Sequence, residues 1–131
     1  MAAVVFDATD AAVVIVAQDA HMNEVYLGAF RRDQLGLPLA VFDECLHTQT
    51  RIEELDETGA DRRIAAGFGW QRYPALLAAN EDRIGNTSDV LYPRARFLLP
   101  LGQAVLDGGG GVAPQDIAPA YLRSKVAEKP A

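Results

Sequence analysis

The sequence has little cysteine, few histidines, no long hydrophobic run and no excess of basic residues. Its single cysteine, Cys45, cannot form an internal disulfide, which is typical of a reducing compartment such as the cytoplasm. The longest apolar run, Ala11 to Ala17, is too short to span a bilayer. The 12 basic residues are outnumbered by 18 acidic ones, and the formal net charge of -6 argues against direct binding of nucleic acid or of an acidic membrane surface.

The amino terminus also lacks the basic residues of a secretory signal, because Asp7 and Asp10 stand where lysine or arginine would be expected. We therefore predict no export and a cytoplasmic location. What is present is a chain of 131 residues, half of them hydrophobic, which is enough for one ordinary globular domain with a modest core.

The stretch from Val13 to Arg32 predicts a β-hairpin. Val13 to Ala17 is apolar without alternation, as expected for a strand that is covered on both faces. Glu24 to Phe30 is a second strand-like run, and the polar gap between the runs is too short for a crossover helix. The two strands should therefore be antiparallel, at the centre of the sheet, with Asn23 as the turn residue best able to take a positive φ.

Strand patterns, caps and turn residues predict the remaining elements. Leu39 to Leu46 predicts a third strand, at an edge because of its acidic residues. Thr50 and Glu53 match the capping box, which predicts a short helix through about Glu57. Further along we expect a strand over 64–68, a helix over 74–79, a strand over 90–92, a helix over 94–106 that contains Pro100, an extended segment over 117–122 and a polar tail over 125–131. This order predicts an α/β fold, a mixed sheet with an antiparallel central hairpin and helices covering it.

Two residue clusters could carry chemistry, and each also has a structural explanation. Cys45 and His47 would share one face of the third strand as nucleophile and base, but Cys45 could equally pack as a small hydrophobic residue. Asp19, His21 and Glu24 surround the hairpin turn, where the carboxylates could instead bind the turn's own amides. No further residues with metal-ligand spacing support them, so we expect neither a metal site nor a catalytic site.

A phosphate-binding loop would place glycines directly before a helix. Gly67 and Gly69 follow a predicted strand and precede a helix-like segment, although close packing of the strand end against Trp70 explains them equally well. The glycines at 108–111 follow a helix instead and predict a turn. The residues alone therefore indicate no active site and no cofactor site.

Four segments, in the same order, resemble motifs of the TsaB (YeaZ) family, which are accessory proteins of threonylcarbamoyl-adenosine tRNA modification once labelled glycoprotease-like. Asp19 to Tyr26 resembles the family's D-A-R-x-x-E-V-Y, with His21 where the family usually has arginine. Gly67-Phe68-Gly69-Trp70 resembles its G-x-G-W segment. The other two are Tyr92-Pro93-Arg94-Ala95 with Leu99-Pro100-Leu101, which is similar to the P-x-A…L-P-x-A helix, and Pro119-Ala120-Tyr121-Leu122-Arg123, which matches P-x-Y-L-R.

The resemblance implies an actin-like, ribonuclease H-like fold, of which this chain would be the second of two lobes. The family's first-lobe signatures, an early Asp-Thr/Ser turn and a later G-P-G-S-F-T-G stretch, do not occur. The apolar start at Met1 to Phe6 falls where the family's linking helix would pass between the lobes. We therefore expect residues 1–131 to form an isolated carboxyl-terminal lobe, natural or truncated, whose uncovered apolar surface around Met1 to Phe6 favours self-association.

The resemblance also implies a non-catalytic scaffold that binds protein partners of the TsaD and TsaE types. Binding should be weakened, because contact with TsaD is understood to be made largely by the first lobe. No cofactor, no membrane contact and no direct contact with nucleic acid are implied. Two alternatives stay open: a glycoprotease-like peptidase, and a nucleotide-binding lobe of an actin-like ATPase.

The candidate partner-binding residues lie in two of the four motif-like segments. They are Asp19, His21, Glu24 and Tyr26 at the hairpin, and Tyr121 and Arg123 near the carboxyl end. The departure from the family pattern at His21 weakens any role carried over to that position. Each candidate also has a structural alternative, with Tyr26 and Tyr121 as core aromatics and Arg123 paired to a carboxylate such as that of Glu24.

Overall fold

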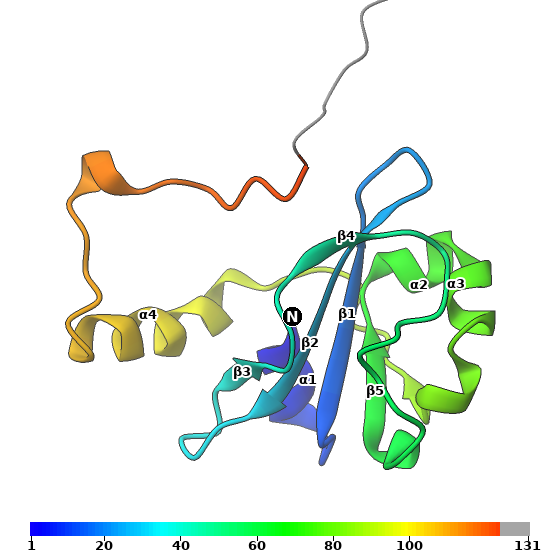
Figure 1. Ribbon diagram of the computed structural model, residues 1–131. Helices are drawn as coiled ribbons and strands as arrows, with labels where there is room; N and C mark the ends of the chain where they lie inside the picture. The colour runs from blue at the N-terminus through cyan, green and yellow to red at the C-terminus, as the bar shows by residue number, and fades with distance from the viewer. Residues whose placement is uncertain (124–131) are drawn as a thin grey trace, which may run out of the picture.

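The computed structural model describes residues 1–123 and shows one mixed β-sheet with helices on both faces (Figure 1). The strands lie in the order β3-β2-β1-β5-β6, and β4 also pairs with β2. Their bounds are Val13–Asp19 (β1), Val25–Arg32 (β2), Pro38–Ala40 (β3), Cys45–His47 (β4), Arg63–Ala66 (β5) and Asn86–Thr87 (β6). The helices are Ala2–Ala8 (α1), Phe68–Arg72 (α2), Pro74–Ala78 (α3) and Leu98–Asp107 (α4), with 3-10 turns at Ala60–Arg62, Glu81–Arg83, Ala95–Phe97 and Pro114–Asp116. The predicted α/β class is confirmed.

The predicted hairpin forms the centre of the sheet. β1 and β2 are antiparallel along their whole length, with Val13 opposite Arg31, and β5 lies parallel on the other side of β1. Val14 and Ile15 point to opposite faces of β1, and both are fully buried. Burial on both faces explains why the sequence of β1 is apolar without alternation.

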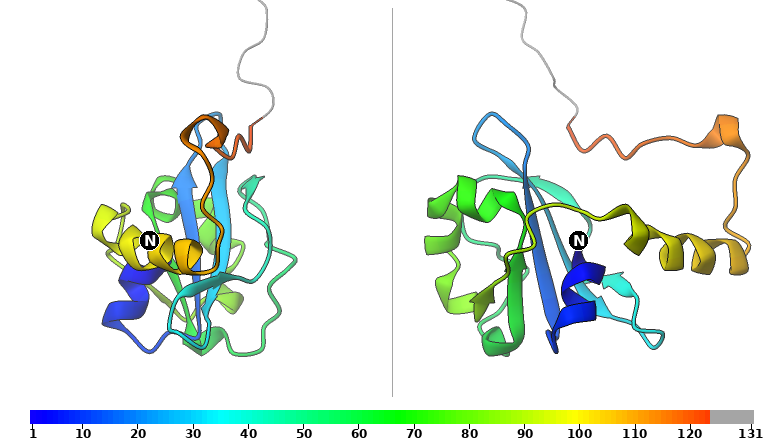
Figure 2. Two further views of the ribbon diagram at one scale, coloured as in Figure 1. Left: turned by 90° about the vertical axis from the view of Figure 1, so that its left-hand side faces the viewer. Right: turned by 180° about the vertical axis from the view of Figure 1, so that it is seen from behind.

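Two clusters of buried residues separate the two faces of the sheet. On the side that we call the packed face, α2, α3 and the loop over 48–59 cover the strands with residues such as Trp70, Leu76 and Ile52. On the side that we call the open face, α1 packs onto Val14 through residues such as Val5. The segment over 1–6, which is predicted to be uncovered, is therefore largely buried, because α1 lies against the sheet. Helix α4 extends away from the body of the sheet (Figure 1 and Figure 2). On the open face, one short helix therefore covers only part of the sheet.

The predicted third strand is two short strands. β3 pairs with the carboxyl end of β2 and β4 with its amino end, so that the four residues 41–44 stand opposite only Gly28 and Ala29. The surplus residues bulge out of the sheet, which interrupts the ladder. A Cβ at Gly28 would lie 3.1 Å from the Phe30 ring and 3.3 Å from Cγ of Glu44, so a larger residue would be crowded there. A glycine within a strand often marks such a bulge, and the predicted edge position is correct for β3.

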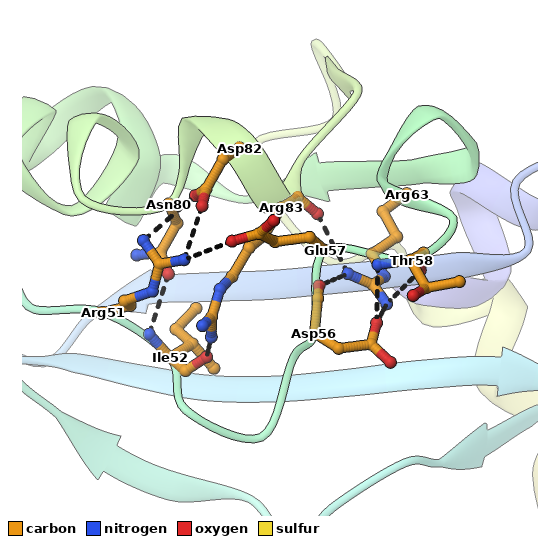
Figure 3. A network of polar contacts seen from close by, with 9 residues as sticks. All are labelled: Arg51, Ile52, Asp56, Glu57, Thr58, Arg63, Asn80, Asp82 and Arg83. Atoms are coloured by element: carbon orange, nitrogen blue, oxygen red, sulfur yellow. Dashed lines mark hydrogen bonds and ion pairs between the residues drawn. The ribbon is translucent and has the colours of Figure 1, made fainter.

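The helix that Thr50 and Glu53 predict does not form, and this segment is an irregular loop. Asn80 prevents it: its side-chain oxygen accepts a hydrogen bond from the Ile52 N–H at 2.8 Å, and its amide nitrogen donates to the Thr50 carbonyl at 3.0 Å (Figure 3). Arg83 donates to the Ile52 carbonyl. These bonds occupy the backbone groups that a helix would use, and Ile52 is fully buried in the packed face.

The structure also differs from the strands predicted over 64–68 and 90–92. β5 ends at Ala66 because α2 begins at Phe68, whereas the helix predicted over 74–79 is present as α3. The segment over 90–92 is not a strand, and β6 lies a few residues earlier. Instead, the carbonyls of Val90 and Leu91 accept the N–H groups of Gly67 and Phe68 at 2.9 and 3.1 Å. This segment therefore provides hydrogen-bond acceptors for N–H groups at the start of α2 rather than extending the sheet.

The helix predicted over 94–106 begins with a 3-10 turn and continues as α4. Pro100 is the third residue of α4, where the missing N–H removes no helical hydrogen bond. Gly109, with a φ of 74°, follows its end. Apolar side chains of α4 stay exposed among the described residues rather than forming a core face, with exposed fractions of 65% for Leu98 and 54% for Val105.

The carboxyl-terminal segment over 117–122 has neither helix nor strand, in keeping with its predicted extended form. The predicted polar tail over 125–131 lies outside the described residues.

No helix in the described part of the chain is both long enough and apolar enough to cross a membrane.

Candidate functional site

The turn between β1 and β2 carries most of the candidate residues, and its backbone is unusual. His21, Met22 and Asn23, which we call the tip, have φ angles of 60°, 55° and 63°. The sequence predicts a positive φ at Asn23 alone. Residues other than glycine rarely adopt this left-handed conformation, at a cost of roughly 1–2 kcal/mol each and less for asparagine. Contacts around the tip must therefore offset this cost.

Bonds within the hairpin provide part of that support. The Ala20 N–H donates to the Glu24 carbonyl at 2.9 Å, and the Glu24 N–H donates to the His21 carbonyl at 3.0 Å. The Asp19 carboxylate accepts the His21 N–H at 2.8 Å and the Tyr73 hydroxyl at 2.7 Å. The Tyr73 hydroxyl and the His21 amide lower the pKa of Asp19, and the same bond raises the pKa of Tyr73. Asp19 is thus an ionised, structural acceptor.

Arg123 reaches the same turn from the far end of the chain. Its Nη2 lies 2.8 Å from Oε2 of Glu24 and donates to the Ala20 carbonyl at 2.9 Å, with the His21 carbonyl at 3.5 Å. The Arg123 side chain is only 15% exposed and that of Glu24 31%. Hydrogen bonds to charged groups contribute about 1.5–3 kcal/mol each, which is comparable with the cost of the left-handed tip. The predicted structural alternative for Arg123, pairing with Glu24, is confirmed.

The tyrosines among the candidates are not core residues, so the structural alternative predicted for them is wrong. Tyr26 is 39% exposed on the open face of β2, where the short helix α1 leaves the sheet incompletely covered. Tyr121 is 83% exposed, because the segment that carries it does not pack into the sheet. The structure therefore brings Asp19, His21, Glu24 and Arg123 together at the turn and leaves Tyr121 as an exposed side chain.

A groove of about 540 Å³ lies on the open face between α1, the strands β1 and β2, and the first turn of α4. Its lining is mainly apolar and includes Val16, Tyr26, Phe30, Phe97 and Leu101. Glu44 and Arg94 bring the charged groups, and the amide of Gln18 is already bonded to the Leu91 carbonyl at 2.8 Å. Such a groove can bury the apolar side chains of a neighbouring segment.

Cys45 and His47 both lie on β4, as the sequence predicts, but they do not form an activated pair. Burial, followed by the charge of Glu54, raises the pKa of the Cys45 thiol, which disfavours the reactive thiolate. Nε2 of His47 lies 3.2 Å from the Thr50 carbonyl oxygen. The arrangement fits the packing alternative for Cys45 better than a nucleophile with its base.

Gly67 and Gly69 serve close packing rather than phosphate binding. A Cβ at Gly67 would lie 2.1 Å from the Ala17 carbonyl oxygen, and one at Gly69 would lie 2.8 Å from the same atom. Trp70 also donates its indole N–H to the Ile15 carbonyl at 3.2 Å. The N–H groups of Gly67 and Phe68, at the start of α2, are bonded to the segment over 90–91 and are therefore not free to bind a phosphate.

Metal ligation finds no support either. Among residues 1–123, no group of three or more His, Cys, Asp or Glu side chains is arranged to hold a metal ion.

A polar network around the loop over 48–59 was not predicted from the sequence. Arg63, which is 8% exposed, holds the Asp56 carboxylate at 2.6 Å and the Thr58 carbonyl at 2.8 Å (Figure 3). Arg51 pairs with Asp82 at 2.5 Å. Charged residues in sequence normally indicate solvent-exposed positions, so no local signal identifies these residues as partners across the loop. Their contacts are structural and hold the loop against the sheet.

Comparisons with known proteins place this geometry in context. No family model matches the chain. The tRNA threonylcarbamoyladenosine biosynthesis protein TsaB of Escherichia coli is 30% identical over 116 residues, which cover 88% of this chain and 50% of that protein. The protein of the same name from Haemophilus influenzae is 28% identical over 134 residues, covering 98% of this chain and 55% of that protein. The chain thus spans about half the length of these relatives.

Solved structures agree with the sequence comparison. YeaZ from Pseudomonas aeruginosa superposes with a TM-score of 0.73 at 27% identity, over 92% of this chain and 54% of that one. A second chain, described as a Pseudomonas aeruginosa protein with similarity to the peptidase YeaZ, gives a TM-score of 0.72 at 28% identity, over 93% of this chain and 56% of that one. The similarity therefore covers nearly all of the fold described above.

Proposed function

Because the chain belongs to the TsaB (YeaZ) family, we propose that it is a partner-binding lobe of a TsaB-type subunit in threonylcarbamoyladenosine modification of tRNA and carries out no catalysis itself. The observation that supports this proposal is that the polar side chains at the candidate site bond within the turn itself. Asp19 accepts a backbone N–H of the turn, and Arg123 pairs with Glu24 and donates to a backbone carbonyl. These groups therefore fix the conformation of the turn. A shape held in this way suits recognition of a protein.

The proposal includes the part of the subunit that this chain represents. We assign it to the second lobe of the two-lobed family fold, in keeping with its coverage of about half of each relative. The open face supports this assignment, since the groove and the exposed apolar residues of α4 form a surface that a neighbouring lobe would cover. In this proposal the lobe is cytoplasmic and contacts proteins rather than the tRNA, in line with the net charge of -6.

The partners proposed are proteins of the TsaD and TsaE types. Their binding to this chain alone should be weak, because the first lobe is expected to make most of the contact with TsaD. Titration calorimetry of the purified chain with the TsaD-type and TsaE-type proteins of the same genome tests this. Saturable binding to either is the expected result, and absence of binding to both, at concentrations near the solubility limit, contradicts the proposal.

Two assays address the enzymatic alternatives with the same protein. Peptide hydrolysis that is lost in both Cys45→Ala and His47→Ala would establish a peptidase and overturn the non-catalytic role. Titration with ATP should give no heat of binding, and saturable heat would favour a nucleotide-binding lobe instead. Both assays need wild-type protein of confirmed fold, for which the thermal transition is a sufficient check.

A further inference from the structure

We propose that Arg123 is a positioning residue that holds the tip, His21 to Asn23, as a preformed protein-contact element. The inference rests on the proposed function, because the tip matters only if this lobe binds a protein. It goes further by identifying which part of the lobe makes a contact and which residue prepares it.

The first step is the position of the Arg123 contacts. They reach the Ala20 carbonyl before the tip, the His21 carbonyl within it and the Glu24 carboxylate after it. One guanidinium group therefore connects both ends of the three left-handed residues. Since a guanidinium is planar and carries its donors in a fixed fork, it restrains these acceptors relative to one another. Nη1 of Arg123 also lies 3.3 Å from Sδ of Met22.

The second step is the exposure of the tip. The His21 side chain is 88% exposed and Met22 is 65% exposed. Strained backbone that is held in place by other groups occurs preferentially at sites of recognition. The exposed side chains of the tip add nothing to the core. The strained conformation is therefore explained by the presentation of these side chains to a partner.

The third step concerns the kind of partner. The two carboxylates beside the tip are already bonded, Asp19 to Tyr73 and Glu24 to Arg123. What remains is a convex element with a thioether and an imidazole and without free charge of either sign from these groups. A protein surface with an apolar pocket for Met22 complements it, since Met adapts to such pockets. A polyanionic RNA would require basic groups, and Arg123 is occupied.

Amide hydrogen exchange measures the positioning role without any partner. Arg123→Gln should speed exchange of the Ala20 and Glu24 amides by about tenfold or more, because both amides close the turn that Arg123 restrains. The Ala65 amide in β5 should stay within about twofold, and Arg31→Gln, an exposed arginine on β2, should change none of the three. Arg123→Lys, which keeps one charged donor group, should recover part of the protection.

Two outcomes overturn the positioning role. One is unchanged exchange at Ala20 and Glu24 in Arg123→Gln. The other is equal acceleration at Ala65, which would mean that Arg123 supports the whole fold rather than the tip. If Arg123→Gln is too unstable to measure, the same criteria apply to Glu24→Gln, which removes the ion pair from its other side.

Binding to the TsaD-type protein then tests the contact role. Met22→Ala should weaken binding by about tenfold while leaving the exchange of Glu24 unchanged, and Arg123→Gln should weaken binding by a similar factor. Wild-type binding that neither variant weakens overturns the contact role, as does tip-dependent binding to tRNA in place of protein. Absence of wild-type binding contradicts the proposed function and the contact role together, whereas the exchange experiment still decides what Arg123 does.

Discussion

The packed face and the open face of one sheet show how differently a single chain can cover its own strands. On the packed face, Trp70 and Leu76 contact the strands, and a network from Asn80, Arg83 and Arg63 fastens the loop that completes the layer. On the open face, α1 covers one region, a groove of about 540 Å³ lies beside it, and α4 leaves its apolar residues exposed.

The two faces therefore have different requirements. The packed face is complete without any other molecule, since its apolar residues are buried and nearly all of its buried polar side-chain atoms have partners. The exception within the described residues is Nε of Arg83. The open face exposes apolar groups that a neighbouring surface would bury. Stability of the chain should therefore depend on the packed face, and association on the open face.

The largest effect expected is from a core truncation on the packed face. Leu76→Ala, at a position with no exposed surface, should lower the free energy of unfolding by about 3 kcal/mol through lost burial and a residual cavity. The matched control on the open side, Leu99→Ala, removes the same atoms from a side chain that is 73% exposed and should change stability by less than about 0.5 kcal/mol. Urea unfolding measures both, and equal losses would remove the distinction between the faces.

The second prediction concerns the polar support of the packed face. Asn80→Ala should destabilise the chain by roughly 2 kcal/mol, because it leaves the buried N–H of Ile52 and the carbonyls of Thr50 and Leu76 without their partner. Asn86→Ala, at an exposed position in β6, is the control and should cost well under half as much. If Asn80→Ala behaved like the control, the network could not explain why the capping-box helix is absent.

The third prediction uses pH. Arg63 lowers the pKa of Asp56, Arg51 lowers that of Asp82, and Tyr73 lowers that of Asp19. Because these folded-state values lie below the unfolded ones, the stabilisation is fully present above about pH 4 and is lost as pH falls through the folded-state values. The melting temperature should therefore fall as the pH is lowered below about 4.

A charge-removing variant separates this effect from general acid sensitivity. Asp56→Asn should lower the melting temperature at neutral pH and show a shallower acid loss than wild type. Asp43→Asn, at an exposed position between β3 and β4, should keep the wild-type acid profile. A wild-type profile for Asp56→Asn would mean that its ion pair with Arg63 has no measurable effect on folding.

The smallest effect expected is weak self-association through the open face. Light scattering should show a mass above that of the monomer at high protein concentration, because exposed apolar residues of α4 favour contact between copies. The double variant Leu98→Glu with Val105→Glu should restore the monomer mass without altering the melting temperature. A monomer mass for the wild-type chain at every concentration would show that the open face does not mediate self-association.

Local signals predicted those elements whose neighbours agree with them. The apolar run of β1 matches a strand buried on both faces, and Pro74 begins a helix where a first-turn proline is tolerated. The candidate turn was identified from residues 19–24, and the pairing of Arg123 with Glu24 was among its predicted alternatives. The predicted core role of Tyr26 failed because α1 leaves that part of β2 uncovered.

Other elements depended on residues far away in the chain. The capping box at Thr50 and Glu53 is a correct local signal, but Asn80 offers the same backbone groups a buried alternative, together with burial of Ile52. The left-handed conformation at His21 and Met22 contradicts their local preference and is restrained by Arg123, about a hundred residues later in the chain.

Neighbouring residues alone specify the mixed α/β class, the antiparallel hairpin at the centre of the sheet and the glycine-marked end of α4, because each follows from a periodicity, a gap length or a backbone preference. Long-range contacts, in contrast, keep residues 50–58 irregular and hold the tip left-handed, and within residues 1–123 no segment covers the apolar side of α4. In those places the outcome depends on which distant side chain reaches a backbone group or an apolar surface. A hydrogen bond or a buried contact of that kind exceeds the fraction of a kcal/mol by which local propensities differ.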